Sequence, residues 1–339
     1  MQRILNDPSM AVEDMIRGFV KAFPQRVSLT SHPKVLKSAD APVPGKVGVV
    51  TGGGSGHDPA FVGYLGQGLC DAVAVGLVFS SPPATAFHAA FRAADSGRGV
   101  VCLYGNYAGD NMNVKMALEM AEDDGIRVKT VVANDDVASA PAHEREKRRG
   151  VAGEVLMWKV GGAKAAMGAD LDKVVAAARK AMNHTRSIGV GLTPCVLPTA
   201  EAPHFSIDHG KMEIGIGHHG EPGVRVEDLG RADEIARKMV QPVLEDLPFQ
   251  RGDDVVVLVS GLGATPMMEI FILFDSIHDL LVEAGLRIHV AYVGEFFTSL
   301  QMAGVTFTMM KLDEELRECI DFPCDAMGLT QLPIGGFTR

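Results

Sequence analysis

Apolar residues follow two alternating patterns along the chain, one typical of buried strands and one typical of helices. Short apolar runs of strand length occupy residues 46–51, 72–79, 99–104 and 127–133 in the first half, and 253–260, 286–295 and 305–311 in the second. Segments of helical length lie between them. Strands that alternate with helices predict an α/β protein, with sheets covered by helices.

Weaker patterns predict further elements. An amphipathic helix is expected within residues 1–25, because its apolar residues share one face: Met15, Ile16, Phe19 and Val20. Helical stretches are also predicted at residues 60–66, 172–182, 225–248 and 267–284. A new strand begins at Ser187, and two short neighbouring strands are expected at 205–207 and 211–216.

The chain is expected to form two domains. Its 339 residues exceed what one ordinary core holds. The pattern changes near His184, where an alanine-rich helix ends and a glycine-rich strand begins. We therefore predict one domain over residues 1–183 and a second over residues 184–339.

Charge and composition exclude some classes of function. The formal net charge of −10 argues against a nucleic-acid-binding surface. The densest basic run, Arg145 to Arg149, is interrupted by an acid and is expected to be a solvated helix face or loop. No 18 uncharged apolar residues follow one another, and no basic segment precedes an apolar core at the N-terminus. Neither a membrane span nor a secretory signal is expected.

The five cysteines point to a reducing compartment. They are odd in number, widely spread and contain no C-x-x-C pair, so neither disulfides nor a zinc site is favoured. We expect a cytoplasmic protein with no metal site.

A glycine-rich segment follows the first predicted strand. Residues 52–59 read Gly-Gly-Gly-Ser-Gly-His-Asp-Pro and run into the predicted helix at 60–66. Free backbone N–H groups at such a turn can hold an anion or a hydroxyl group. The segment matches neither the P-loop pattern nor G-x-G-x-x-G, in which His57 would have to be glycine. A tight turn without a ligand stays an open alternative.

Two adjacent histidines precede a sharp turn in the second half. Residues 213–217 alternate like a strand, and residues 220–223, Gly-Glu-Pro-Gly, turn the chain. His218 and His219 are then expected at a strand end, facing opposite sides. A neutral imidazole there can attack a carbonyl carbon or move a proton near pH 7. The alternative is a pair of surface histidines on a hairpin. Gly215, Gly217 and Gly220 also fit G-x-G-x-x-G, but no apolar helix follows, so a dinucleotide site is rejected.

Asp110 is a further candidate because it follows a glycine between a strand and a helix. It could cap that helix or act as a general base toward a substrate hydroxyl group. The two roles are compatible.

Several motifs, in one order, carry a family resemblance. They are Ala-Asp-Ala-Pro-Val at 39–43, the 52–59 segment, Gly-Gln-Gly at 66–68, Asn-Tyr-Ala-Gly-Asp at 106–110, Arg-Arg-Gly-Val-Ala at 148–152, His-Gly-Glu-Pro-Gly at 219–223 and Leu-Gly-Ala-Thr-Pro at 262–266. With them the chain, from Ile4 to about Leu332, resembles the substrate-binding K subunit (DhaK) of dihydroxyacetone kinases, also called glycerone kinases. The resemblance implies two α/β domains, each a mixed sheet flanked by helices.

The resemblance also implies a mechanism and a set of site residues. The histidine before Gly-Glu-Pro-Gly, here His219, adds to the substrate ketone as a hemiaminal. Asp110 accepts the proton of the terminal hydroxyl group, and His57 is the second catalytic histidine. The residues expected to contact the ketose are Gly54, Ser55, Gly56, His57, Gly105, Asp110 and His219.

One position departs from the family pattern. The usual Lys-Asn-Tyr-Thr-Gly-Asp reads Gly-Asn-Tyr-Ala-Gly-Asp here, so Gly105 replaces a lysine. The change removes a positive charge and frees space. We therefore expect a ketose bulkier than dihydroxyacetone, such as erythrulose.

The resemblance further implies a partner. No nucleotide-binding element is recognisable in the chain, so it is expected to hold no cofactor itself. ATP or ADP, with Mg, is expected on an L subunit (DhaL-type) that delivers the phosphoryl group. A homodimer is also implied. The alternative within the family is a non-catalytic coactivator that senses the ketose.

Overall fold

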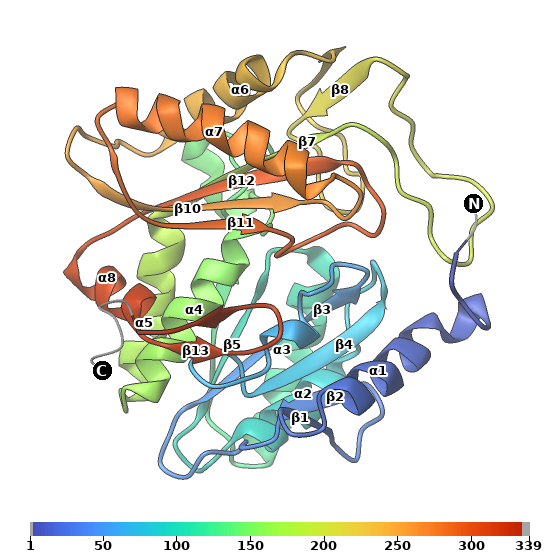
Figure 1. Ribbon diagram of the computed structural model, residues 1–339. Helices are drawn as coiled ribbons and strands as arrows, with labels where there is room; N and C mark the ends of the chain where they lie inside the picture. Colours follow the sequence, from blue (N-terminus) through green and yellow to red (C-terminus); the bar gives the residue numbers. More distant parts are fainter. Residues whose placement is uncertain (1–2, 334–339) are drawn as a thin grey trace.

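The computed structural model describes residues 3–333 and contains two six-stranded sheets, one above the other in Figure 1. The lower sheet has the order β1-β2-β4-β3-β5-β6. Its strands are β1 (Val27–Leu29), β2 (Val35–Ser38), β3 (Gly48–Ser55), β4 (Ala72–Val78), β5 (Val100–Gly105) and β6 (Val128–Ala133). Strands β3 to β6 pair in parallel, whereas β1 and β2 are antiparallel.

Helices cover both faces of this lower sheet. Adjacent residues of β3 point to opposite faces, as strand geometry requires. Val50 packs with α2 (Ala84–Ala94) and α3 (Ala108–Asp123), whereas Val49 packs with α1 (Ala11–Ala22), α4 (Gly153–Ala166) and α5 (Leu171–Asn183). The fully buried strands explain why their sequences read as continuous apolar runs.

The upper sheet has the order β11-β10-β12-β7-β8-β9, and only β10 and β11 pair in parallel within the described residues. Its strands are β7 (Thr185–Gly191), β8 (Lys211–Ile214), β9 (Arg225–Asp228), β10 (Asp254–Gly261), β11 (Arg287–Gly294) and β12 (Gly304–Lys311). Helices α6 (Ala232–Asp246) and α7 (Met267–Glu283) cover its outer face.

Helix α4 joins the two layers. Its residues belong to the same apolar cluster as Val256 and Leu258 of β10 and as α8 (Glu314–Asp321). A helix contacted on all sides needs no polar face, and Trp158 and Lys159 in its middle are completely buried. The Lys159 amine donates to the backbone carbonyls of Cys319 and Phe322, which satisfies the buried cation.

Smaller elements complete the chain. They are the 3₁₀ turns Pro8–Met10, Val62–Tyr64 and Ala142–Lys147 and the strands β13 (Cys324–Asp325) and β14 (Thr330–Gln331). The β13–β14 pair returns to the lower layer, where Asp325 forms an isolated bridge with Gln67 in the segment before β4. Among residues 3–333, no helix is both long enough and apolar enough to span a bilayer.

The predicted fold class is confirmed: two mixed sheets are flanked by helices. The division into domains 1–183 and 184–339 stays a prediction, and its outer ends, residues 1–2 and 334–339, lie outside the described residues. The first sheet does end at Ala133 and the second begins at Thr185.

Three predicted elements are wrong. Residues 60–66 form no α-helix beyond the short 3₁₀ turn, because both glycines are packing positions: a Cβ on Gly63 would lie 2.7 Å from Pro59, and one on Gly66 2.0 Å from the Asp325 carbonyl oxygen. Residues 205–207 form a loop. The expected helix at 225–248 begins only at Ala232, because residues 225–228 pair with β8 as strand β9.

Candidate active site

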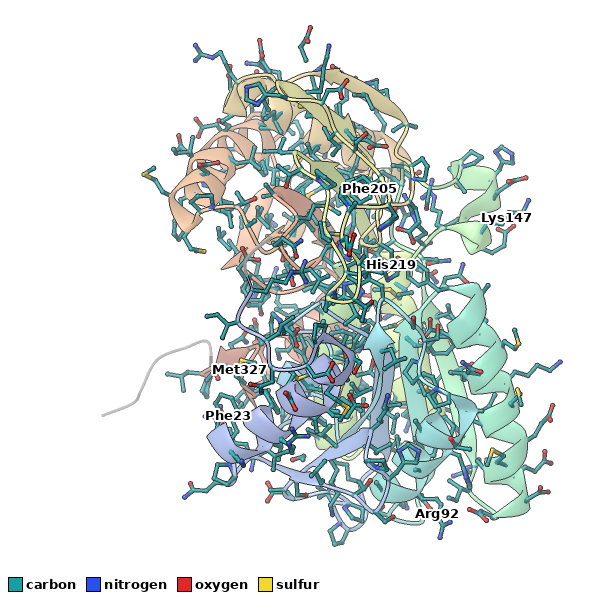
Figure 2. All side chains as sticks on the ribbon, turned by 90° about the vertical axis from the view of Figure 1, so that its right-hand side faces the viewer. Phe23, Arg92, Lys147, Phe205, His219 and Met327 are labelled. Carbon is teal, nitrogen blue, oxygen red and sulfur yellow. The ribbon has the colours of Figure 1, made fainter. Side chains whose placement is uncertain are left out.

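A cavity of about 240 Å³ lies between the two sheets. It is bounded below by the ends of β3 and β5 and the start of α3, and above by the 215–223 loop between β8 and β9. Figure 2 shows His219 where the two layers meet, with Phe205 above it. The lower wall is the carboxyl edge of parallel strands, the usual ligand site of such sheets. The volume is below the roughly 300–1,000 Å³ typical of drug-sized ligands, which favours a small substrate.

His219 is held by a carboxylate from its own loop. Its Nδ1 lies 2.8 Å from Oε1 of Glu221, and its backbone N–H donates to Oε2 of the same carboxylate at 3.0 Å. The side chain is 25% exposed and lines the cavity. The strand ends at Ile214, so both histidines lie in a turn and strand alternation does not set their directions. The prediction of a strand-end pair is wrong in this respect.

A second imidazole faces the first. Nε2 of His57 lies 3.0 Å from Nε2 of His219, and Nδ1 of His57 lies 2.8 Å from the Thr298 carbonyl oxygen. A carbonyl oxygen only accepts, so Nδ1 of His57 carries a proton; by the same argument the Glu221 carboxylate assigns a proton to Nδ1 of His219. The short contact between the two Nε2 atoms then requires one further proton between the rings.

The surroundings of the two rings favour one charge state for His57 and one for Glu221. Burial, followed by the neighbouring His219 and His218, lowers the pKa of His57 well below its ordinary value. Burial alone would raise the pKa of Glu221, but the hydrogen bond and charge of His219 outweigh it and hold that pKa below its ordinary value. Burial therefore favours a neutral His57, whereas Glu221 is ionised beside Nδ1 of His219.

His218 has a different environment from its neighbour. It is 2% exposed, its Nε2 lies 3.1 Å from the Thr306 hydroxyl oxygen, and its ring centroid is 4.7 Å from that of Phe297. Burial, followed by the charge of His219, lowers its pKa to about 3. His218 is a neutral wall residue, and the alternative of two surface histidines is excluded.

Asp110 lies across the cavity, in the first turn of α3. The N-cap of this helix is Tyr107, so the capping alternative for Asp110 is excluded. Oδ2 accepts a 2.6 Å hydrogen bond from the Ser81 hydroxyl, while the buried Oδ1 has no partner among residues 3–333. Burial raises the pKa of Asp110 to about 6, against the lowering effect of Ser81. A carboxylate with that pKa is suited to accept a proton near neutral pH.

The glycine segment contributes in part. Gly54 lines the cavity, but Ser55 and Gly56 do not. The Ser55 hydroxyl instead donates to the Gly76 carbonyl, and the Gly56 carbonyl accepts from the N–H of Leu300, which joins the two sheets next to His57. The strand continues through the glycines, so they allow close packing: a Cβ on Gly53 would lie 2.1 Å from the Phe61 ring.

Gly105 lines the cavity at the end of β5, beside Glu154 of α4. A Cβ at position 105 would lie 2.4 Å from Oε1 of Glu154, closer than real Cβ contacts occur. The carboxyl group thus occupies space next to the position where the family's usual lysine would begin.

Five residues of the site were not singled out from sequence. Glu221 belongs to the His-Gly-Glu-Pro-Gly motif at 219–223. Its position two residues after His219 was the available indication that it contacts this histidine. Ser81 follows the end of β4, and this place at a strand end was the available indication. The others are Phe79, Tyr107 and Glu154, whose positions depend on packing between distant segments.

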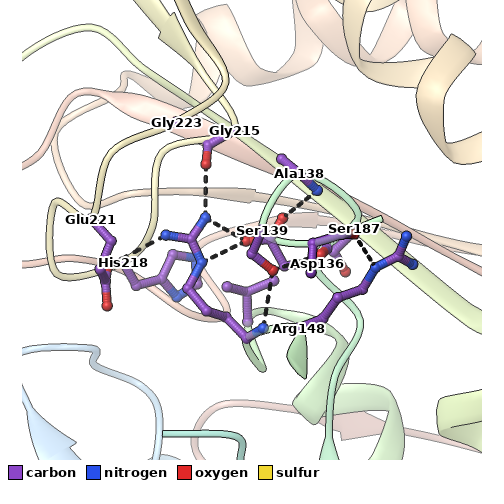
Figure 3. Close-up of polar contacts among 12 residues, drawn as sticks. Asp136, Ala138, Ser139, Arg148, Ser187, Gly215, His218, Glu221 and Gly223 are labelled. Carbon is purple, nitrogen blue, oxygen red and sulfur yellow. Dashed lines mark hydrogen bonds and ion pairs between the residues drawn. The ribbon is translucent and has the colours of Figure 1, made fainter. Parts of the chain in front are cut away.

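The loop that carries His219 is braced by the connection between β6 and α4. Nε of Arg149 donates to Asp136 at 2.9 Å, and another guanidinium nitrogen donates to the Gly215 carbonyl at 2.9 Å. Figure 3 shows this region, with Gly215 above Asp136 and Ser139 and with Glu221 to their left. Arg148 is 1% exposed and pairs with Asp246. The expectation of a solvated basic run is therefore wrong for these two arginines.

Comparison with known proteins identifies the family. The family model described as the Dak1 domain matches residues 17–328. The chain belongs to the Dak1 family. A PTS-dependent dihydroxyacetone kinase 2, dihydroxyacetone-binding subunit DhaK, of Listeria innocua is 41% identical over 96% of this chain and 98% of its own length. The resemblance to the DhaK family predicted from the motifs is confirmed.

Two further relatives differ in what their names say they do. A D-erythrulose kinase of Mycolicibacterium smegmatis is 41% identical, and this chain spans 59% of its length. A solved structure of a dihydroxyacetone kinase operon co-activator, Dha-DhaQ, superposes with a TM-score of 0.87 at 31% identity, covering 93% of this chain and 97% of the other. The fold and family are thus shared by kinases and by a co-activator.

Proposed function

We propose that this chain is the ketose-binding subunit of a dihydroxyacetone-type kinase and that His219 binds the ketose covalently. The observation that carries the proposal is the pair of imidazoles in the cavity, with Nε2 of His219 and His57 3.0 Å apart and Glu221 on the far nitrogen of His219. A ring nitrogen beside a proton acceptor is a nucleophile with its base in place.

The addition step balances with these residues alone. The proton between the rings moves to His57, which frees the Nε2 lone pair of His219 to attack the ketone carbon. The C=O π electrons move to oxygen, and His57 returns the proton to that oxygen. The product is a hemiaminal with a new N–C bond, and the ring charge is balanced by Glu221 throughout. Because the step requires a carbonyl group, glycerol is rejected.

Asp110 acts in the second step. With the ketone carbon fixed on His219, a terminal hydroxyl group reaches Asp110 across the cavity, and the carboxylate accepts its proton as phosphoryl transfer proceeds. Anchoring supplies orientation, an effect that reaches about 7–11 kcal/mol in well-oriented systems. The reaction class is phosphoryl transfer to an alcohol group.

The phosphoryl donor is carried by a second protein. A DhaL-type subunit with ATP, or with ADP recharged by a phosphotransferase, and Mg supplies the phosphoryl group when it docks. The chain alone is expected to bind ketose without phosphorylating it.

A homodimer is the proposed assembly. Support comes from exposed apolar residues on the first two turns of α7: Met267, Met268, Phe271 and Ile272, which are 42–70% exposed. Large apolar side chains grouped on one helix face favour contact with another protein surface.

The test uses dihydroxyacetone labelled with ¹³C at the ketone carbon. We expect its NMR signal to move from the ketone region to the region of saturated carbon when the chain is added, and to stay unmoved with His219→Gln. His209→Gln, which changes an exposed histidine in the same half of the chain, is the matched control. A signal that stays in the ketone region with the native chain would contradict the proposal.

The second candidate function is a ketose-sensing co-activator, which the likeness to Dha-DhaQ favours. The Asp110 carboxylate across the cavity favours the kinase, because sensing needs no base. Phosphorylation of dihydroxyacetone or erythrulose by the chain with an added L subunit and ATP would decide for the kinase. Adduct formation without phosphorylation, tried with L subunits of several kinases, would decide for the co-activator.

A further inference from the structure

One carboxyl group of the cavity wall has no role in the proposed chemistry. Glu154 lies in the first turn of α4, is 1% exposed and lines the cavity beside Gly105. Its Oε2 atom is buried and has no hydrogen-bond partner in the described part of the chain, residues 3–333. Buried polar atoms in folded proteins nearly always have a partner. An unpartnered carboxyl oxygen at a ligand cavity therefore points to a ligand group.

The nearest backbone donors are engaged by another residue. Asp135 accepts from the N–H groups of Val151 at 3.2 Å and Gly153 at 2.9 Å, and from the Ser187 hydroxyl at 2.5 Å. The Val151 and Gly153 N–H groups lie at the start of α4, where free donors would otherwise serve an acid in the first turn. The helix start thus satisfies Asp135 and not Glu154.

The Glu154 carboxyl group occupies space that is free because residue 105 is a glycine. A Cβ at position 105 would lie 2.4 Å from Oε1 of Glu154 and 3.3 Å from the Tyr107 ring. A side chain at position 105 and the present position of the Glu154 carboxyl group exclude each other. A lysine at position 105, the family's usual residue, would therefore require the Glu154 carboxyl group to move.

We propose that Gly105 and Glu154 form a subsite for a hydroxyl group that dihydroxyacetone lacks, so that the chain selects a four-carbon ketose over the triose. The inference rests on the proposed ketose-binding function and names the residue that determines its specificity. Glu154 is a specificity residue and takes no part in the bond-forming steps.

The charge state fits a neutral ligand group. Burial, followed by the charges of Asp135 and Asp110, raises the pKa of Glu154 well above its ordinary value. The protonated acid offers one O–H donor and one carbonyl acceptor. A sugar hydroxyl group, which both donates and accepts, can pair with both.

The experiment compares three ¹³C-labelled ketones in adduct titrations of the native chain. They are dihydroxyacetone, erythrulose in both enantiomers, and 1,3-dihydroxybutan-2-one, which has the four carbons of erythrulose but lacks its C4 hydroxyl group. We expect one enantiomer of erythrulose to bind roughly tenfold or more tightly than the other two compounds, the ratio that about one buried hydrogen bond gives.

Two variants locate the effect. Glu154→Leu removes the polar atoms at similar length, and the preference for erythrulose over 1,3-dihydroxybutan-2-one is expected to fall to near one while the dihydroxyacetone adduct still forms. Glu154→Gln keeps a neutral donor and acceptor, so most of the preference is expected to remain. Glu119→Gln, at an exposed position of α3, is the control.

Each outcome decides. Equal affinity of the native chain for erythrulose and 1,3-dihydroxybutan-2-one overturns the subsite even if Glu154→Leu does not fold. Loss of the preference in Glu154→Gln overturns pairing by a neutral acid and indicates that an ionised carboxylate accepts the hydrogen bond of the hydroxyl group. A native chain that forms the dihydroxyacetone adduct without any preference contradicts this inference alone, whereas a chain that forms no adduct contradicts the proposed function as well.

Discussion

The lower and upper walls of the cavity are built in different ways. Below, Asp110 stands on α3, which directly follows β5, and it accepts a hydrogen bond from Ser81, which follows β4. Above, His219 stands in a turn beyond the end of β8 and takes its orientation from Glu221 two residues away. The proposed base is thus positioned by regular elements, whereas the proposed nucleophile is positioned by its own loop.

This difference separates two steps of the proposed reaction. Adduct formation depends on the upper wall together with His57, and phosphoryl transfer depends in addition on the lower wall. Substitutions in the two walls are therefore expected to have different effects on binding and on turnover.

The largest effect is expected in the upper wall. His219→Gln removes the nucleophile, so both the ketose adduct and turnover should be lost, with kcat/KM at least about 10⁴-fold lower because covalent orientation is gone. Phosphorylation with an added L subunit and the labelled-ketone NMR signal measure the two effects. His209→Gln should leave both unchanged. If His219→Gln still phosphorylates ketose at the native rate, the upper wall has no separate role in the reaction.

The next effect is expected in the lower wall. Asp110→Asn keeps the shape but removes the base, so kcat should fall by about 10²–10⁴-fold while the adduct still forms, since the hydroxyl group is not needed for that bond. Parallel NMR titration and phosphorylation assays measure this split. Asp170→Asn, at the N-cap of α5, is the matched control. Equal loss of adduct and turnover would show that the walls do not act separately.

The pH dependence sharpens the same contrast. Burial raises the pKa of Asp110 to about 6, and only the deprotonated carboxylate accepts a proton. The rate of phosphoryl transfer should therefore be full above about pH 7 and fall as the pH drops through 6, close to tenfold per unit below it. The rate of the adduct-loaded chain, followed from pH 5 to 8, should show this limb, and Asp110→Asn should lack it. If the Asp110→Asn variant shows the same fall in rate below pH 6, the fall is caused by the titration of another group.

The smallest effect is expected at the residue that orients the nucleophile. Glu221→Gln keeps an acceptor for Nδ1 of His219 but removes the balancing charge, so the adduct should weaken by about 10–100-fold, the range of a hydrogen bond to a charged group. Titration of labelled dihydroxyacetone measures it, with the exposed Glu201→Gln as control. Unchanged affinity would mean that the loop alone orients the ring.

The sequence was sufficient for the parts of the molecule that depend on local pattern. The strongly apolar runs of β10 and β12 and the helix α7 were placed to within one or two residues. The motifs also pointed to the three residues that meet in the cavity, namely His57, Asp110 and His219. The fold class can be predicted from such elements, because the spacing of apolar residues differs between helices and strands.

Other features depend on contacts between distant segments, which a single sequence does not reveal. Residues 60–66 were predicted as helix because their glycines gave no indication that Asp325 and Pro59 press against them. The pairing of His57 with Thr298 joins residues 241 positions apart. In the sequence Glu154 is an ordinary acidic residue at a helix start. It lines the cavity because α4 packs against β5.

The central claim is a reversible bond between one imidazole nitrogen and a ketose carbon, and a crystal structure of the chain soaked with dihydroxyacetone or erythrulose tests it most directly. The account predicts continuous density from the ketone carbon to Nε2 of His219, with a tetrahedral carbon and a terminal hydroxyl group directed to Asp110. A planar ketone separated from His219, or a bond to another residue, would contradict it.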